Sequence, residues 1–222
     1  MLYLYAITNW RPRPSGDGLR GRPLRVVFAD GLAATISEHA EELRFEEDDL
    51  WAHEEVVEDL MGGGPVLPVR IGSSLTSDDD VRATLRERRD EFDRALQRVR
   101  GAVELGVRAT AADARLSGAA SPPPGRSGSG TDYLMSRLGQ QRRHEDIATR
   151  VHEPLARIAR ESVTRSGFAE RGAIKAAYLV DTDRVEAFRG RVEELGRELD
   201  GASIVCTGPW PPYSFASSEQ SG

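Results

Sequence analysis

The fold is decided by the stretch Leu24-Arg-Val-Val-Phe-Ala-Asp-Gly-Leu-Ala-Ala-Thr-Ile-Ser37. Two apolar runs, 24–28 and 32–37, flank the pair Asp30-Gly31. A tight hairpin turn needs positive φ at both central residues, which Asp and Gly tolerate, so the pattern predicts two antiparallel strands. A doubly wound parallel sheet would instead alternate strands and helices from its start. The hairpin therefore favours an α+β fold with a mixed antiparallel sheet.

The residues around the hairpin complete a first α+β unit. Residues 2–8 alternate in a pattern typical of a buried strand, and apolar spacing predicts a helix over 48–61 that ends at Gly62-Gly63-Gly64. Residues 65–71 are predicted to form a strand. Because Pro68 cannot donate a ladder hydrogen bond, we expect this strand at a sheet edge or near a bulge. A second helix is predicted from Ser77 to about Val99.

The second half of the chain follows a similar pattern. Strands are predicted over 103–109, 173–181 and 202–207, and a helix over 183–199. Residues 117–130 are rich in Ser, Gly and Pro, which predicts a flexible surface loop. A long helix is predicted over 132–165, with a kink or break at Pro154. The whole order is βββαβα followed by βαβαβ.

This order predicts two consecutive α+β units rather than one sheet. Each is expected to be a modified ferredoxin-like α/β sandwich with a mixed antiparallel sheet. We place the first domain at residues 1–100 and the second, which includes the tail rich in proline and aromatic residues, at 101–222.

Charge is distributed unevenly along the 222 residues. The chain holds 30 basic and 36 acidic residues, and the first hundred residues (14 basic, 20 acidic) account for the whole net charge of −6. A broadly basic nucleic-acid binder is excluded, because such proteins need excess cations to neutralise phosphates. Residues 38–59 carry 11 acids and one arginine. They form either a solvated helix face or a docking surface for a basic partner.

The sequence indicates an intracellular, soluble protein. No apolar run approaches the roughly 20 residues that a membrane-spanning helix needs, and the N-terminus lacks the features of an export signal. The single cysteine, Cys206, lies in an apolar segment, which excludes an intramolecular disulfide and indicates a buried, inert thiol. We therefore expect no lipid membrane as a partner.

No catalytic, cofactor-binding or metal-ligating residues are predicted. The four histidines, at 39, 53, 144 and 152, do not form a His-Glu-x-x-His motif. The run Gly62-Gly63-Gly64 follows a helix and precedes a strand, whereas phosphate-binding loops follow a strand and open a helix. Without a nucleophile, base and metal together, an enzyme is not expected.

Two stretches stand out as candidate contact surfaces: residues 65–72 and 207–215. In the second, three prolines stiffen the chain, so its aromatic side chains would lose little entropy on binding. This tail could pack over its own domain as a lid or anchor a partner. The predicted partner-binding residues are Pro65, Val66, Leu67, Pro68, Val69, Arg70, Gly72, Gly208, Pro209, Trp210, Pro211, Pro212, Tyr213 and Phe215.

These motifs together resemble the gas vesicle protein family GvpF/GvpL. The family pattern has a Leu-Tyr-x-Tyr-Ala-Ile strand, a His ahead of a Val-Val pair, a Val-Leu-Pro-Val-Arg-(Phe/Ile)-Gly segment, a Val-Glu-x-Gly-Val strand, a Tyr-Leu pair, an Ala-Tyr-Leu-Val strand and a closing Thr-Gly-Pro-Trp-Pro-Pro-Tyr-Ser-Phe. The matching positions here are 2–7, His53 with Val56 and Val57, 66–72, 103–107, Tyr133 with Leu134, 177–180 and 207–215. The main departures are Ile71, where Phe is commoner, and the long loop at 117–130.

The resemblance implies a cytoplasmic, non-enzymatic accessory or minor structural protein, associated with gas vesicles, that needs no cofactor. Its implied partner is the apolar major shell protein, GvpA, and other gas vesicle accessory proteins are further candidates; nucleic acid is not. We expect the acidic first half to supply solubility, while 65–72 or 207–215 contacts the shell protein. The alternative is a small-molecule-binding regulatory module of ferredoxin-like fold.

Overall fold

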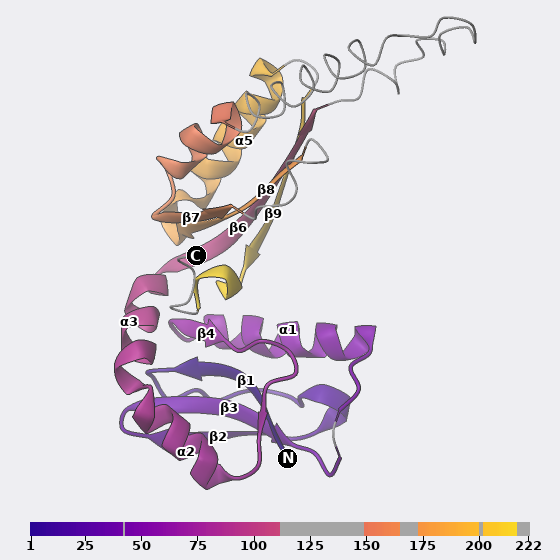
Figure 1. Ribbon diagram of the computed structural model, residues 1–222, viewed down its shortest axis with the longest axis vertical. Helices are drawn as coiled ribbons and strands as arrows, with labels where there is room; N and C mark the ends of the chain where they lie inside the picture. Colours follow the sequence, from indigo (N-terminus) through magenta and orange to yellow (C-terminus); the bar gives the residue numbers. More distant parts are fainter. Residues whose placement is uncertain (42, 112–148, 165–172, 200–201, 217–222) are drawn as a thin grey trace, which may run out of the picture. The chain divides into compact units, whose positions relative to one another are not determined.

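The computed structural model describes residues 1–41, 43–111, 149–164, 173–199 and 202–216. Its internal contacts group into two compact units (Figure 1). The first comprises Met1–Glu104 together with the segment that begins at Trp210, and the second is Leu105–Pro209. The sequence placed the whole C-terminal tail in the second domain; the contacts place its last part with the first.

The first unit contains an antiparallel sheet in the order β2-β3-β1-β4, with β5 also paired to β1. Its strands are β1 (Leu2–Thr8), β2 (Leu24–Ala29), β3 (Leu32–Glu38), β4 (Val66–Pro68) and β5 (Ser74–Leu75). The predicted hairpin is confirmed, since Ala29 pairs with Leu32 and the turn residues Asp30 and Gly31 have φ of 49° and 87°. The edge position expected from Pro68 is also confirmed, because β4 ends the sheet order.

Helices cover both faces of this sheet. All seven residues of β1 are buried, and successive strand side chains point to opposite faces, so both sides of the strand must be covered. Helix α1 (Glu47–Met61) packs Val57 and Leu60 on the face that carries Tyr3 and Tyr5. Helices α2 (Asp78–Glu87) and α3 (Arg89–Val99) contact β2, β3 and β4. Two short 3-10 helices also belong to this unit: η1 (Leu19–Gly21) and η4 (Tyr213–Phe215).

One helix prediction for this unit needs correction. The single helix expected over 77–99 is broken at Arg88, which has φ −105° and ψ 18°. No proline or glycine marks the break. It allows α2 to contact β2 and β3 while α3 contacts β4, a requirement of the sheet that the local sequence does not display.

The second unit is built on a sheet in the order β7-β8-β6-β9. Its strands are β6 (Ala102–Ala111), β7 (Glu161–Thr164), β8 (Ala173–Asp181) and β9 (Ala202–Trp210). Its helical segments are residues 149–156, the 3-10 helix η3 (Thr182–Arg184) and α5 (Val185–Glu198). Phe188, Val192 and Leu195 of α5 pack in a core with Tyr178 of β8. The order βαββαβ is compatible with a ferredoxin-like arrangement. The protein thus has the predicted α+β fold.

The C-terminal boundary predicted for the long helix over 132–165 is wrong. The helix ends near residue 156, soon after Pro154, and β7 forms where the helix was expected to continue. The chain turns back at Arg160, whose backbone N–H donates to the carbonyl of Leu179 in β8 (2.8 Å). Residues 132–148, and the predicted loop at 117–130, lie outside the described residues.

Candidate functional site

A cluster of buried aromatic and polar side chains lies between β1 and α1. Tyr3 and Tyr5 extend from β1, and His53 extends from α1; none is more than 1% exposed. The Tyr3 hydroxyl is hydrogen-bonded to Nδ1 of His53 (2.8 Å), and the His53 ring stacks on Tyr5 with centroids 5.5 Å apart. The two tyrosine rings meet edge to face at 4.9 Å. These contacts offset the cost of burying the Tyr3 hydroxyl and Nδ1 of His53, whereas Nε2 of His53 makes no hydrogen bond of regular geometry.

The cluster continues into β3 through Tyr5. Its hydroxyl accepts a hydrogen bond from the backbone N–H of Leu19 (2.7 Å) and pairs with the hydroxyl of Ser37 (2.8 Å). The Ser37 hydroxyl is in turn 2.9 Å from Nε2 of His39. A continuous chain of hydrogen bonds therefore ties the start of η1 to β1 and β3.

The histidine in this cluster is neutral. Burial lowers the pKa of His53 from 6.5 to about 4. A contact with the backbone of Val69 favours the charged imidazole and counteracts part of this shift. Burial also raises the pKa of Tyr3, although a hydrogen bond from the Gly72 backbone counteracts part of that effect. At neutral pH the imidazole and both phenols are therefore uncharged, and their hydrogen bonds join elements of the first unit.

The C-terminal segment closes over the same cluster. The Tyr213 ring lies 6.3 Å from the His53 ring, and the buried Tyr213 hydroxyl faces the Glu54 carboxyl without a hydrogen bond of regular geometry. Burial raises the pKa of Glu54. The backbone N–H and the hydroxyl of Ser214 both donate to the Glu104 carboxylate (2.8 Å each). With Phe215 fully buried, this segment is part of the first unit's core.

The predicted partner-binding residues divide by exposure. The structure buries Val66, Leu67, Pro68, Pro211, Pro212 and Phe215. It half-buries Pro65, Val69, Gly208 and Tyr213, and it exposes Arg70, Gly72, Pro209 and Trp210. The two motifs meet at His53, which the backbone of Val69 approaches from one motif and the ring of Tyr213 from the other.

Several residues of this region were not among the predicted site residues. Tyr3, His53 and Glu104 are polar side chains in otherwise apolar strands and helix faces, a signal that could have marked them as members of a buried network. Ser37 and His39 carried no such signal, because they lie at the end of a strand where polar residues are ordinary. Among the residues that the structure describes, no group of three or more His, Cys, Asp or Glu side chains could hold a metal ion.

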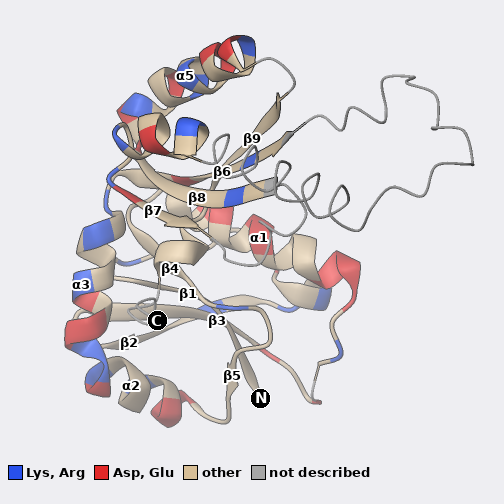
Figure 2. Ribbon diagram, turned by 45° about the horizontal axis from the view of Figure 1, so that its top comes forward, with Lys and Arg blue, Asp and Glu red and all other residues tan. Residues whose placement is uncertain are grey.

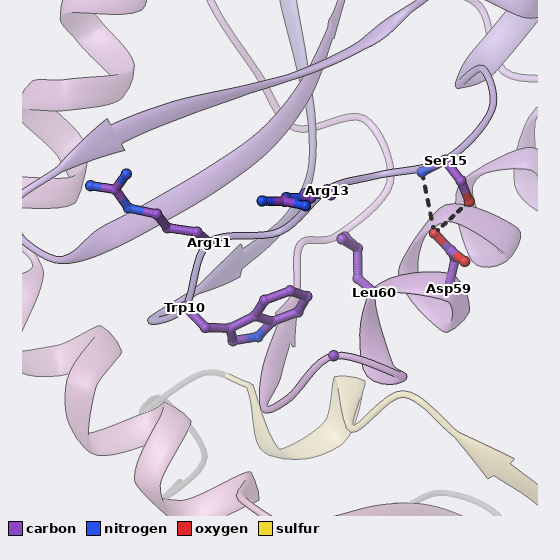
Figure 3. A pocket seen from close by; sticks show the side chains of 7 residues that line it. Trp10, Arg11, Arg13, Ser15, Asp59 and Leu60 are labelled. Atoms are coloured by element: carbon purple, nitrogen blue, oxygen red, sulfur yellow. Dashed lines mark hydrogen bonds between the residues drawn. The ribbon is translucent and has the colours of Figure 1, made fainter.

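A small cavity of about 290 Å³ lies beside the C-terminal end of α1 (Figure 3). The Trp10 indole forms one wall and donates from Nε1 to the carbonyl of Pro65 (3.2 Å). A Cβ at Gly63 would overlap this ring, so any larger residue there would displace the indole. The side chains of Arg11, Arg13 and Asp59 also line the cavity, and Asp59 accepts a hydrogen bond from the Ser15 hydroxyl (3.1 Å).

The outer face of α1 is different from its buried face. Leu50 and Trp51 are 42% and 65% exposed, and Phe45, just before the helix, is 37% exposed. Exposed carboxylates surround these apolar side chains, and the acidic turns of α1 are visible in Figure 2. Of the helices that the structure describes, none is long and apolar enough to cross a membrane.

Comparison with known proteins assigns these motifs to one family. A model of the family described as gas vesicle synthesis protein GvpL/GvpF matches residues 1–217. The chain belongs to the GvpL/GvpF family.

Relatives of both named types are similar to this GvpL/GvpF chain. Gas vesicle protein L of Streptomyces sp. strain CB03234 is 32% identical over 248 residues, covering 96% of this chain and 92% of the relative. Gas vesicle protein F of the same organism is 32% identical over 219 residues, covering 90% of each chain. The crystal structure of GvpF from Anabaena sp. PCC7120 shares the fold, with a TM-score of 0.81, 22% identity, and coverage of 97% of this chain and 95% of that one.

Membership in the GvpL/GvpF family gives the buried cluster a simple interpretation. Three stretches that match the family pattern, at positions 2–7, 53–57 and 66–72, supply Tyr3, His53 and the backbone of Val69 to one place. The closing motif adds Tyr213. These motif residues are therefore the internal framework of the first unit, and the chain is a gas vesicle-related protein.

Proposed function

We propose that this GvpL/GvpF protein is a non-enzymatic accessory or minor structural component that binds the major shell protein, GvpA, and supports gas vesicle assembly. It would act in the cytoplasm and in association with the vesicles. The observation that carries the proposal is the match of residues 1–217 to a family described by gas vesicle synthesis.

The surface of the first unit supports such a role. A shell subunit with a strongly apolar face would aggregate in water unless a partner covered that face. A suitable partner needs exposed apolar side chains on a chain whose net charge keeps it dissolved. This chain has a net charge of −6, and the described residues of its first unit include exposed apolar side chains at Phe45, Leu50, Trp51 and Trp210.

Within the predicted contact stretches, Trp210 is the residue best placed to touch the shell protein. Its side chain is 42% exposed, while Pro211 and Pro212 are buried and Ser214 is tied to Glu104. An anchored segment presents its exposed side chain with little conformational entropy left to lose on binding. The buried motif residues would then hold Trp210 in position rather than contact the partner themselves.

Capture of purified shell protein by the immobilised full chain tests this proposal. We expect Trp210→Ala to reduce capture by about tenfold or more, as the loss of a central aromatic anchor does. Phe28→Ala is the matched control, because Phe28 is an aromatic residue of the same unit with similar exposure (46%). Equal capture by wild type and Trp210→Ala would remove the tail as the contact, and no capture by wild type would refute shell-protein binding.

A further inference from the structure

The outer face of α1 combines an apolar centre with acidic surroundings. Leu50 and Trp51 lie side by side in the sequence on this face, and exposed Glu47, Glu55 and Glu58 occur three to eight residues away. This spacing places them along one side of the helix, since residues three, four, seven and eight apart share a face. Trp51 is the most exposed large apolar side chain among the described residues.

The carboxylates on this face are not neutralised by nearby arginines. Within the part of the chain that the structure describes, Glu47, Asp48, Glu55 and Glu58 make no salt bridge. Salt bridges are more frequent in the other helices, although Glu87, Asp90 and Glu193 make none among the described residues. Asp78 and Asp79 pair with one arginine in α2, Asp93 pairs with Arg89 in α3, and two glutamates pair with Arg191 in α5.

The stability of α1 does not explain this pattern. Acids in the first turn of a helix favour its positive end, but Glu55 and Glu58 lie in the second half, where the helix dipole disfavours negative charge. The last turn of α1 has no basic residue, whereas the last turns of α2, α3 and α5 contain Arg86, Arg98 and Arg197. Glu54 and Glu58, four residues apart, also repel each other, and this repulsion adds to the raised pKa of Glu54.

We infer that the outer face of α1 docks a basic amphipathic segment of another protein, with an apolar side chain of that segment seated on Trp51 and Leu50. Arginine or lysine side chains of the segment would pair with the unneutralised carboxylates around this centre. At a rise of about 1.5 Å per residue, a 15-residue helix such as α1 offers about 22 Å of surface, enough for several turns of a partner helix. The inference goes beyond the proposed function, because it concerns a second surface and does not require shell-protein binding at Trp210.

The test uses the full chain and synthetic peptides. The probe is a fluorescently labelled amphipathic peptide with leucines on one face and arginines on the other. A control peptide carries glutamate in place of every arginine. We expect the arginine peptide alone to bind, with an affinity that falls as salt is raised. Trp51→Ala should weaken binding by about tenfold or more. Glu55→Gln combined with Glu58→Gln should weaken it by about fivefold.

Matched controls separate this surface from net charge. Glu87→Gln combined with Glu193→Gln removes two exposed carboxylates from α2 and α5 and should leave binding within about twofold of wild type. Absence of saturable binding, equal binding of the glutamate peptide, or no response to Trp51→Ala would overturn the inference. Sedimentation velocity without peptide tests whether a second copy of the chain binds to this face instead. If the protein self-associates and Trp51→Ala abolishes the self-association, a second copy covers the face and the inference is wrong. Shell-protein capture is measured separately with Trp210→Ala, so failure of one proposal is distinguishable from failure of the other.

Discussion

The two faces of α1 differ in what holds their residues in place. The inner face buries His53, Val57 and Leu60 against β1, and the neutral His53 is hydrogen-bonded to Tyr3. The other buried polar residue of α1, Asp49, is paired with Arg20. The outer face exposes Trp51 and a set of carboxylates without basic partners in the described part of the chain. The comparison separates residues that the first unit needs in order to fold from residues that are free to meet a partner.

Substitutions of buried residues in the first unit should change its stability most. Phe215→Ala should lower the free energy of unfolding of the first unit by about 3–5 kcal/mol, because the ring is fully buried and its loss leaves a cavity. All three tryptophans, at 10, 51 and 210, belong to this unit, so tryptophan fluorescence excited selectively during urea unfolding reports on it alone.

Trp210→Ala is the control for that measurement, since it changes an exposed residue of the same motif. It should change the unfolding free energy by less than about 1 kcal/mol. If both substitutions had the same small effect, the closing motif would not be part of the first unit's core.

The pH dependence of unfolding tests the neutral state of His53. The folded pKa is about 4, below the ordinary value of 6.5, so protons bind the unfolded state preferentially and stability falls as pH drops through this window. The expected loss between pH 6.5 and 4 is about 3 kcal/mol, at about 1.4 kcal/mol per unit. Burial of His39 lowers its pKa and acts in the same direction, whereas the raised pKa of Glu54 opposes it.

The variant His53→Gln isolates this contribution. Urea unfolding at several pH values should show a clearly shallower loss of stability below pH 6.5 in the variant, with His39 supplying the remainder. An unchanged slope would mean that His53 is already protonated in the folded protein at these pH values.

Tyr3→Phe should have an intermediate effect. It removes the hydroxyl bonded to His53 and leaves the buried Nδ1 without a partner, which costs about 1–3 kcal/mol. The double variant Tyr3→Phe with His53→Leu removes both polar groups and should recover part of the loss. Urea unfolding followed by fluorescence measures the free energy change of each variant. If the free energy changes of the two single substitutions simply add in the double variant, Tyr3 and His53 do not interact directly.

A substitution on the outer face of α1 should change the stability least, and it should increase the stability instead of lowering it. Glu58→Lys should stabilise the first unit by about 0.3–1 kcal/mol, because it relieves repulsion with Glu54 and places a cation near the C-terminal end of the helix. The same variant should bind the arginine peptide less tightly than wild type. A loss of stability instead would show that Glu58 already has a favourable role in the folded unit.

Local rules were enough to predict most of the secondary structure. Asp30-Gly31 adopts the positive φ values that its hairpin requires, and α1 ends at Met61 before the glycines. The break at Arg88 and the strand β7 were missed, because both serve contacts with strands distant in sequence rather than a local preference.

The candidate site was predicted in its parts but not in its arrangement. The stretches 65–72 and 207–215 were singled out, but the sequence did not show which of their residues are buried. For 207–215 it left two alternatives, a lid over its own domain and an anchor for a partner. Trp51 was not singled out, because the sequence does not show whether an aromatic residue in a helix is buried or exposed.

The α+β fold class, the acidic first half and the gas vesicle family could be predicted from the sequence alone, since they depend on composition, periodicity and motifs along the chain. The three-dimensional fold was needed to show that Tyr3, His53, Val69 and Tyr213 meet at one place, and that Trp51 and Trp210 remain on the surface. Whether a side chain is buried depends not on its neighbours in the sequence but on its neighbours in space. Those neighbours lie up to 160 positions away in the chain, as Tyr213 does from His53.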